Sequence, residues 1–309
     1  MSKDLIEDIK LTFIIPTKGR LKELNTLLAS IGAQKIKPYQ AIILDAGNAP
    51  LKERIAIDNL PIKYIYTGPN SLTEARNIGI QNIPEDSTLA GFLDDDVILC
   101  EDATKKMMDF WQNAPPEIGG ASFNVINRRH SRKLWVFKKL FFLGDNLPGN
   151  VLASGYQTML DNTDRDIFTK WLPGGATVWR KEVFDEFKFD ENYKGYGCME
   201  DTDFSYGVGK KYKLILLSSA KLIHQPHPMN RKAQFHLGYA EIVNRFYFID
   251  KHEEFSKYLF YWASLGRFIE NFVFSTITLN SGYFNKALGN ILGIKKVIFR
   301  SNKNNELDE

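Results

Sequence analysis

The first 110 residues of the chain alternate between short apolar runs and longer segments with helical spacing. The apolar runs at residues 11–16, 41–44, 62–66 and 89–93 have the length and composition of buried strands. Apolar residues within 21–33 recur at helical spacing, and residues 71–80 begin with Ser71 three positions before Glu74, which is the capping box of a helix. Strands and helices that alternate in this way predict a parallel sheet with right-handed crossovers.

Three consecutive carboxylates, Asp94 to Asp96, follow the last of these predicted strands. Like charges this close raise one another's pKa unless something positive lies among them. Carboxylate oxygens suit Mg²⁺ or Mn²⁺, and a metal held by one or two carboxylates usually shares its other positions with substrate phosphates. Ligands of parallel sheets bind beyond the carboxyl ends of the strands, where Thr17 and Asp45 are also expected. The sequence therefore predicts one site for a phosphate-bearing ligand.

Composition narrows the class of protein. The 309 residues are 44% hydrophobic and 25% charged, which supports a substantial core, and the net charge of +3 is too small to favour nucleic acid as a partner. The two cysteines form no framework, which fits a reducing compartment. The N-terminal segment lacks the apolar core of a signal peptide, and no uncharged apolar stretch reaches the roughly 18–20 residues of a membrane span. We expect a cytoplasmic protein, with association with the inner face of the membrane as a further hypothesis.

The stretch between Glu117 and Asp145 contains no acidic residue and interleaves basic with aromatic side chains. Its basic residues are Arg128, Arg129, Arg132, Lys133, Lys138 and Lys139. Three interpretations stay open: a solvated loop over core aromatics, contact with an anionic acceptor, or contact with a membrane surface. The aromatic-rich residues 258–284 similarly suit either helix packing or membrane contact. The polar residues 301–309 are expected to be disordered.

Five motifs follow one another in the chain. They are FIIPTKGR at 13–20, LDAGN at 44–48, SLTEARNIGI at 71–80, FLDDDV at 92–97, and a later Gly174-Gly175 followed by Met199-Glu200-Asp201. In this order and spacing they resemble the family 2 glycosyltransferases of the GT-A fold, over roughly residues 10 to 228. The resemblance implies an α/β fold with a Rossmann-like, mostly parallel twisted sheet flanked by helices. We expect a nucleotide-sugar-binding half at 1–115, an acceptor-binding and catalytic half at 116–230, and a C-terminal helical extension at 231–309.

The resemblance also implies a role for residues near the donor. Asp45 would accept a hydrogen bond from the base, Pro16 and Thr17 would line the nucleotide pocket, and Arg76 would project toward it. Asp94 would meet the ribose or a metal-bound water. A turn or cap role is the structural alternative for Asp45.

The metal site implied by the resemblance consists of Asp96 and His224, with His227 as a competing histidine. Mn²⁺ tolerates a histidine ligand better than Mg²⁺ does, and either ion is expected as the cofactor. Asp95 is grouped with the nucleotide-sugar-binding residues, although side-chain alternation directs it away from the metal.

The chemistry implied by the resemblance centres on Asp201, which would remove the proton of the acceptor hydroxyl. Glu200 would contact the acceptor or brace the site, and Gly174 and Gly175 would lie beside the donor sugar and the acceptor. A helix cap is the structural alternative for Asp201.

These residues predict an inverting, metal-dependent glycosyltransferase of hexosyltransferase type. It would move a sugar from a nucleotide-diphosphate donor, with a UDP-sugar favoured, to a hydroxyl of a glycan or lipid-linked acceptor in surface polysaccharide or glycoconjugate synthesis. One alternative is a catalytically inactive sugar-nucleotide-binding module. The other is a haloacid dehalogenase-like phosphatase, which is disfavoured because three predicted strands precede the acidic motif.

Overall fold

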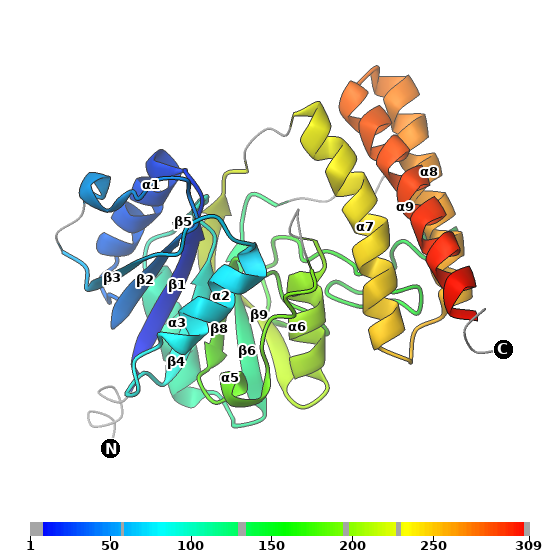
Figure 1. Ribbon diagram of the computed structural model, residues 1–309. Helices are drawn as coiled ribbons and strands as arrows, with labels where there is room; N and C mark the ends of the chain where they lie inside the picture. The colour runs from blue at the N-terminus through cyan, green and yellow to red at the C-terminus, as the bar shows by residue number, and fades with distance from the viewer. Residues whose placement is uncertain (1–8, 57–58, 129–133, 194–197, 227–229, 306–309) are drawn as a thin grey trace. The chain divides into compact units, whose positions relative to one another are not determined.

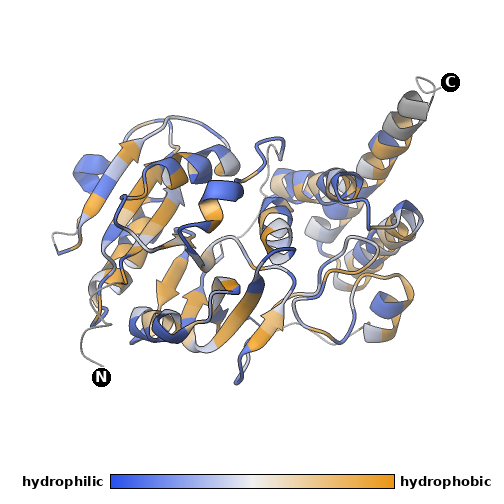
Figure 2. Cartoon of the chain, turned by 90° about the horizontal axis from the view of Figure 1, so that it is seen from below, coloured by the Kyte–Doolittle hydropathy of each residue, from blue (hydrophilic) through white to orange (hydrophobic). Residues whose placement is uncertain are grey.

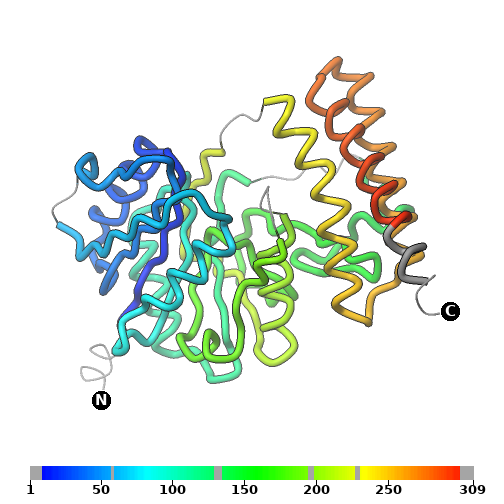
Figure 3. The backbone as a smooth tube through the Cα atoms, in the orientation of Figure 1, coloured from blue at the N-terminus to red at the C-terminus, as the bar shows by residue number. Residues whose placement is uncertain are grey.

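The computed structural model describes residues 9–56, 59–128, 134–193, 198–226 and 230–305. The chain forms two compact units. The first contains residues 1–130, 160–192 and 200–227, and the second contains residues 131–159, 193–199 and 228–309. The chain thus leaves the first unit after residue 130 and returns to it at residue 160 (Figure 3). The division at residues 115 and 230 expected from the sequence stays a prediction.

The first unit is built on one sheet (Figure 1). Its strands are β1 (Leu11–Thr17), β2 (Gln40–Asp45), β3 (Ile62–Tyr66), β4 (Leu89–Leu93), β5 (Val97–Leu99), β6 (Ile118–Val125), β7 (Ile167–Thr169), β8 (Ala176–Arg180) and β9 (Lys213–His224). Their order is β3-β2-β1-β4-β8-β6-β9-β5, with β7 paired to β9 outside this path. Strands β3, β2, β1 and β4 run parallel, as predicted, and β8 is antiparallel to both β4 and β6. The carboxyl ends of β1, β2, β4, β6 and β9 therefore meet at one edge.

Helices cover both faces of this sheet. Successive side chains of the central strands point to opposite sides, so both faces carry apolar side chains that the helices bury. Phe13 and Ile15 of β1 pack with α1 (Leu21–Gly32) and α3 (Ala103–Asn113). Ile14 packs on the other face with α2 (Leu72–Gln81), α5 (Val183–Glu186) and α6 (Glu200–Gly209). Strands buried on both sides are apolar along most of their length, as the orange strands in Figure 2 show. A short 3-10 helix, η1 (Lys52–Arg54), follows β2.

Several predicted elements differ from the observed ones. The strands predicted at 62–66 and 89–93 and the capping box of Ser71 and Glu74 are confirmed. Strands β6, β7 and β8 were not predicted from the sequence. The pairing of β9 with β6 shifts register between Phe123 and Asn124, as at a β-bulge, and β9 continues as one strand past this point.

The second unit is helical. Its helices are α4 (Trp135–Leu140), α7 (Arg231–Lys251), α8 (Lys257–Thr278) and α9 (Ser281–Asn305). Helices α7 and α9 approach closely through glycine, since a Cβ on Gly238 would lie 2.2 Å from the carbonyl oxygen of Lys286. Helix α9 continues to Asn305, five residues into the tail predicted to be disordered, because extending an established helix costs little. None of the described helices is long and apolar enough to cross a membrane.

Candidate active site

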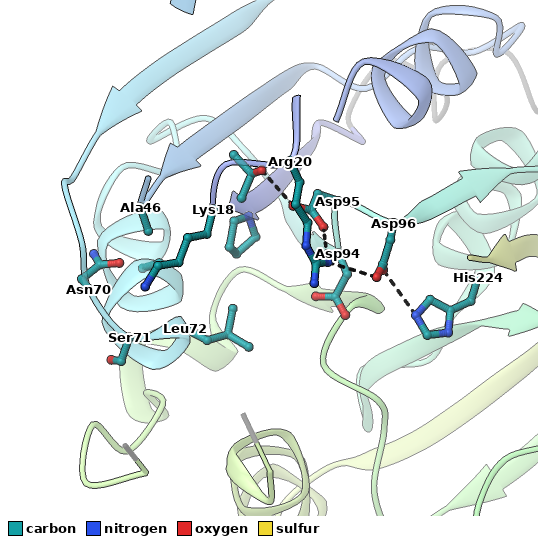
Figure 4. Close-up of a pocket in the computed structure, with 13 residues that line it drawn as sticks. Lys18, Arg20, Ala46, Asn70, Ser71, Leu72, Asp94, Asp95, Asp96 and His224 are labelled. Carbon is teal, nitrogen blue, oxygen red and sulfur yellow. Dashed lines mark hydrogen bonds and ion pairs between the residues drawn. The ribbon is translucent and has the colours of Figure 1, made fainter. Parts of the chain in front are cut away.

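The carboxyl edge of the sheet encloses a cavity of about 370 Å³ (Figure 4). Residues from β1, the loop after β2, α2, the loop after β4 and the end of β9 line it: Pro16, Thr17, Lys18, Arg20, Ala46, Asn70, Ser71, Leu72, Ala75, Asp94, Asp95, Asp96 and His224. The parallel register places Thr17 directly beside Asp45, so the first two loops start from neighbouring positions. The structure therefore gathers the N-terminal motifs and the aspartate triplet around one cavity.

Asp95 points toward the loop after β1. Its Oδ2 accepts a hydrogen bond from Thr17 Oγ1 at 2.8 Å, and its Oδ1 accepts one from Arg20 Nη1 at 3.0 Å. Burial raises the pKa of Asp95 to about 6, while the Thr17 hydrogen bond and the Arg20 charge oppose the shift. Asp95 thus holds the loop after β1 in place from the wall of the cavity.

Asp96 faces His224, because the antiparallel pairing of β5 with β9 sets Val97 opposite His224. The Nε2 of His224 lies 3.3 Å from Asp96 Oδ1, and Arg20 Nη1 lies 3.2 Å from Asp96 Oδ2. Burial raises the pKa of Asp96, but the His224 hydrogen bond and the charges of His224 and Arg20 outweigh it and leave the pKa below its ordinary value. Asn127 fixes the backbone of His224 with two hydrogen bonds, of 2.7 and 3.1 Å.

A divalent metal fits this end of the cavity on the chemistry of its donors. Asp96 offers carboxylate oxygens and His224 an imidazole nitrogen, a set that Mn²⁺ accepts. Within the described parts of the chain, no group of three or more His, Cys, Asp or Glu side chains is arranged to hold a metal ion. The further oxygens would have to come from substrate and water, which is usual for a Mg²⁺-type site.

A buried arginine connects two of the predicted site carboxylates. Arg76 of α2 is 1% exposed; its Nη2 lies 3.3 Å from Asp94 Oδ1 and its Nη1 3.3 Å from Glu200 Oε1. The guanidinium also lies over the ring of Phe189, 5.1 Å from its centroid. Burial and the charge of Asp201 raise the pKa of Glu200, and Arg76 opposes this. Burial likewise raises the pKa of Asp94.

Gly174 and Gly175 make room for this arrangement. A Cβ on Gly174 would lie 2.6 Å from Arg76 Nη1, and a Cβ on Gly175 would lie 1.9 Å from the Asp94 carboxyl carbon. The backbone N–H of Asp94 also donates to the carbonyl of Gly175 at 3.0 Å. Glycine at these two positions therefore leaves room for the side chains of Arg76 and Asp94, independently of any bound substrate.

Asp201 is half-buried at the start of α6 and lies next to the glycine pair. Its Oδ2 accepts a hydrogen bond from the Gly174 N–H at 3.1 Å, and its Oδ1 accepts one from the Thr202 N–H at 2.7 Å. The residue at the entry to this helix, Met199, has a φ of +80°. A left-handed backbone at such a residue costs on the order of 1–3 kcal/mol and is commonly retained at functional sites.

Asp45 is fully buried, and it is Ala46 that lines the cavity. The Asp45 carboxylate accepts hydrogen bonds from the N–H groups of Gly47 and Leu51, both at 2.9 Å, and from Tyr64 Oη at 2.5 Å. Burial and this last bond raise the pKa of Tyr64 to about 12. The observed contacts are those of the turn-forming alternative, and the contact with a base stays a prediction.

Two arginines make contacts at the site that the sequence did not predict. Arg20 sits in what the sequence indicated only as a turn, and it contacts two aspartates. Arg128 follows β6 and interacts electrostatically with Asp201, Asp161 and Asp94, while burial lowers its pKa. Its Nη1 is buried without a hydrogen-bond partner among the described residues. Strand β6 was not predicted, so the position of Arg128 at the carboxyl edge could not be seen.

Some predicted features lie outside the described residues. These are His227 and, in the basic stretch, Arg129, Arg132 and Lys133. The remaining predicted site residues are all placed in the first unit, at the carboxyl edge of the sheet.

Two solved structures share the fold. The mannosyltransferase PcManGT from Pyrobaculum calidifontis, in complex with GDP-Man and Mn²⁺, aligns with a TM-score of 0.57 and 11% identity, over 96% of this chain and 88% of its own. GalNAc-T7 with UDP, GalNAc and Mn²⁺ aligns with a TM-score of 0.58 and 14% identity, over 79% of this chain and about half (48%) of its own. At these identities the likeness shows the fold, which is that of the GT-A glycosyltransferases.

The family follows from the sequence comparison. The model of glycosyl transferase family 2 matches residues 12–166, half of the chain, and the chain therefore belongs to this family. The uncharacterized glycosyltransferase YwdF of Bacillus subtilis (strain 168) is 26% identical over 219 residues, which cover 70% of this chain and 74% of YwdF. The uncharacterized glycosyltransferase RC0461 of Rickettsia conorii is 25% identical over 60% of this chain, but only 29% of its own length. The predicted family and fold are confirmed.

Proposed function

We propose that this glycosyltransferase transfers a hexose, with inversion, from a nucleotide-diphosphate donor to a hydroxyl of its acceptor, in a reaction that requires a divalent metal. One observation carries the proposal. The carboxylates of Asp94, Asp96 and Asp201, which suit metal binding and proton removal, converge at the carboxyl edge of the sheet, where the charges of Asp96 and Asp201 both act on Asp94.

The donor would occupy the cavity between the loop after β1 and α2. Its volume of about 370 Å³ and the basic side chains of Lys18 and Arg20 suit a nucleoside diphosphate. GalNAc-T7 and PcManGT, which share the fold, were solved with UDP or GDP-Man and Mn²⁺, which supports a sugar nucleotide and a divalent metal here as well. We favour a UDP-sugar.

The metal, Mn²⁺ or Mg²⁺, would be held by Asp96 and His224, with Asp94 nearby, and would supply positive charge where the diphosphate leaves. Arg76, which is buried, holds the carboxylates of Asp94 and Glu200 in position through an ion pair with each. Asp95 and Arg20 fix the loop that forms the wall of the nucleotide pocket.

Asp201 would act as the general base. As the acceptor oxygen forms its bond to the anomeric carbon, the bond to the diphosphate oxygen breaks, and the hydroxyl proton passes to the Asp201 carboxylate. Attack from the face opposite the leaving group inverts the anomeric centre. The hydrogen bond from the Gly174 N–H orients Asp201 for this step.

The acceptor would be a glycan or a lipid-linked precursor in surface polysaccharide or glycoconjugate synthesis, with the enzyme associated peripherally with a membrane. The alternative is a module that binds sugar nucleotides without turning them over. Such a module would retain the nucleotide pocket but would not require a general base at Asp201.

The test has two steps. Thermal-shift measurements with UDP, GDP and dTDP, each with and without Mn²⁺, should show a metal-dependent rise in melting temperature for one nucleotide, because a ligand of the folded state stabilises it. With the matching sugar nucleotide, Asp201→Asn should lower release of the nucleoside diphosphate about 10²–10⁴-fold while leaving nucleotide affinity unchanged.

Asp185→Asn, an exposed acid on α5, is the matched control and should behave as wild type. Turnover by Asp201→Asn near the wild-type rate would show that Asp201 is not the base. Tight nucleotide binding with no turnover by the wild type would favour the inactive module.

A further inference from the structure

Exposed apolar side chains gather around α4 in the second unit. Val136 is 68% exposed and Leu140 60% exposed, and Trp135 and Phe142 are partly exposed, at 44% and 38%. Monomeric soluble proteins expose single apolar side chains commonly but contiguous groups of this kind rarely, and such groups usually mark a binding surface.

The same apolar surface continues onto α8. The indole of Trp262 stacks on Phe141, with ring centroids 4.7 Å apart, and its Nε1 donates to the carbonyl of Leu140 at 3.0 Å. Tyr258, which is 89% exposed, precedes Trp262 by four residues, and the exposed Leu265 follows it by three, so the three share one face of α8. The α4–α8 face is defined by the following residues: Trp135, Val136, Leu140, Tyr258, Trp262 and Leu265.

The charge beside this face is positive. Lys139 is exposed, and its Nζ lies 5.5 Å from the centre of the Trp135 ring. Lys138 is ion-paired with Glu270, its Nζ 3.6 Å from Oε1, so Lys139 is the cation of α4 that faces solvent. Surfaces that combine apolar side chains with Lys and Arg bind anionic lipid, through burial of the apolar part and attraction of the headgroups.

The two tryptophans of the face are suited to an interface between water and lipid. The indole N–H of Trp135 donates to Asn146 Oδ1 at 2.5 Å, and that of Trp262 donates to the Leu140 carbonyl. Both polar groups are satisfied within the protein, so neither ring leaves an unpaired donor when it enters an apolar environment.

A second copy of the chain is a less suitable occupant. A two-fold dimer places the same surface of both copies face to face, which would bring Lys139 against its own counterpart. We propose that the α4–α8 face docks the enzyme on an anionic membrane surface, which extends the proposed function by bringing the site to a lipid-linked acceptor.

Co-sedimentation of the full chain with vesicles tests the proposal. The wild type should bind vesicles of equal parts phosphatidylcholine and phosphatidylglycerol, should bind phosphatidylcholine alone weakly, and should be released by salt. The double variant Val136→Asp, Leu140→Asp should lose binding by more than about tenfold, since both side chains would carry charge into the interface. Lys139→Glu changes two charges and should weaken binding roughly thirtyfold.

Phe168→Asp, which alters a side chain of the first unit that is 62% exposed, is the matched control and should bind as wild type. Light scattering should show the same oligomeric state for the wild type and the double variant, and their melting temperatures should agree. No binding to anionic vesicles, equal binding by the double variant, or a wild-type dimer that this variant dissociates would overturn the proposal. The vesicle assay uses no donor, so it can succeed even if the nucleotide screen fails.

Discussion

Replacing Arg76 with methionine tests the buried charge arrangement beneath the candidate site. Arg76 is 1% exposed and Glu200 5% exposed, so Arg76→Met leaves the Glu200 carboxylate buried without its cation. Removing one partner of a buried ion pair costs about 3–5 kcal/mol, because the remaining charge is uncompensated. Asp94 is 42% exposed at its side chain and adds little to this cost. Methionine fills most of the arginine's volume beside Phe189, so loss of packing is a minor part.

This loss of stability should depend on pH. The pKa of Glu200 is already raised from its ordinary value of 4.5 by burial and by Asp201, and loss of Arg76 raises it further. A carboxyl group whose pKa is higher in the folded than in the unfolded state costs nothing below the unfolded pKa, and its cost grows with pH until the folded pKa is passed. Beside Arg76 the pKa of Glu200 is already about 7, so the additional penalty of Arg76→Met should be small near pH 4.5 and should grow above pH 7 by about 1.4 kcal/mol per pH unit, up to the higher pKa of the variant.

Thermal and urea denaturation at pH 4.5 and pH 9 measure the effect, and a fall in melting temperature of about 5 °C is expected at pH 9, from a loss of about 2–3 kcal/mol. The double variant Arg76→Met, Glu200→Gln should recover most of the loss, since it buries no uncompensated charge. Arg54→Met, at an exposed arginine of η1, is the control. A loss below about 1 kcal/mol, or an equal loss at both pH values, would refute the reasoning.

Two further variants examine the metal and the glycine pair. Asp96→Ala should lower the affinity for the selected nucleoside diphosphate in Mn²⁺ at least tenfold by calorimetry, to the level measured without metal; unchanged affinity with metal present would exclude Asp96 as a ligand. Gly175→Ala should reduce turnover about 10²-fold, because its methyl group would lie 1.9 Å from the Asp94 carboxyl carbon and must displace it. Gly207→Ala, whose methyl group would meet nothing closer than 3.9 Å, should retain activity. Equal activity of the two glycine variants would contradict the proposed role of Gly175.

The first half of the sheet could be predicted because its strands are mainly apolar. Strand β6 could not, although all eight of its residues are buried. Its sequence, IGGASFNV, mixes glycine and polar residues, and the glycines are required because the rings of Tyr212 and Trp179 lie where Cβ atoms would be. Those rings come from distant parts of the chain, so the reason for the sequence of β6 is visible only in the folded protein.

The candidate site, like the sheet, could be predicted from the sequence only in part. The sequence indicated which residues would gather, because motifs at strand ends meet at one edge of a parallel sheet. It could not show that Arg76 contacts Glu200, 124 residues away, or that Gly174 and Gly175 accommodate Arg76 and Asp94. It also left Asp45 with two alternatives, and its bonds to Gly47, Leu51 and Tyr64 depend on the conformation of a loop that has no periodic pattern.

The aspartate triplet poses a problem of charge that the fold solves with its own cations. Arg20 contacts Asp95 and Asp96, His224 contacts Asp96, and Arg76 contacts Asp94. These contacts offset part of the repulsion, although burial still raises the pKa values of Asp94 and Asp95. A divalent ion alone would have to compete with Arg20 and His224 for the oxygens of Asp96. A nucleoside diphosphate brings negative charge that Arg20 can contact instead, so metal and diphosphate should each strengthen the binding of the other, as reciprocal linkage requires.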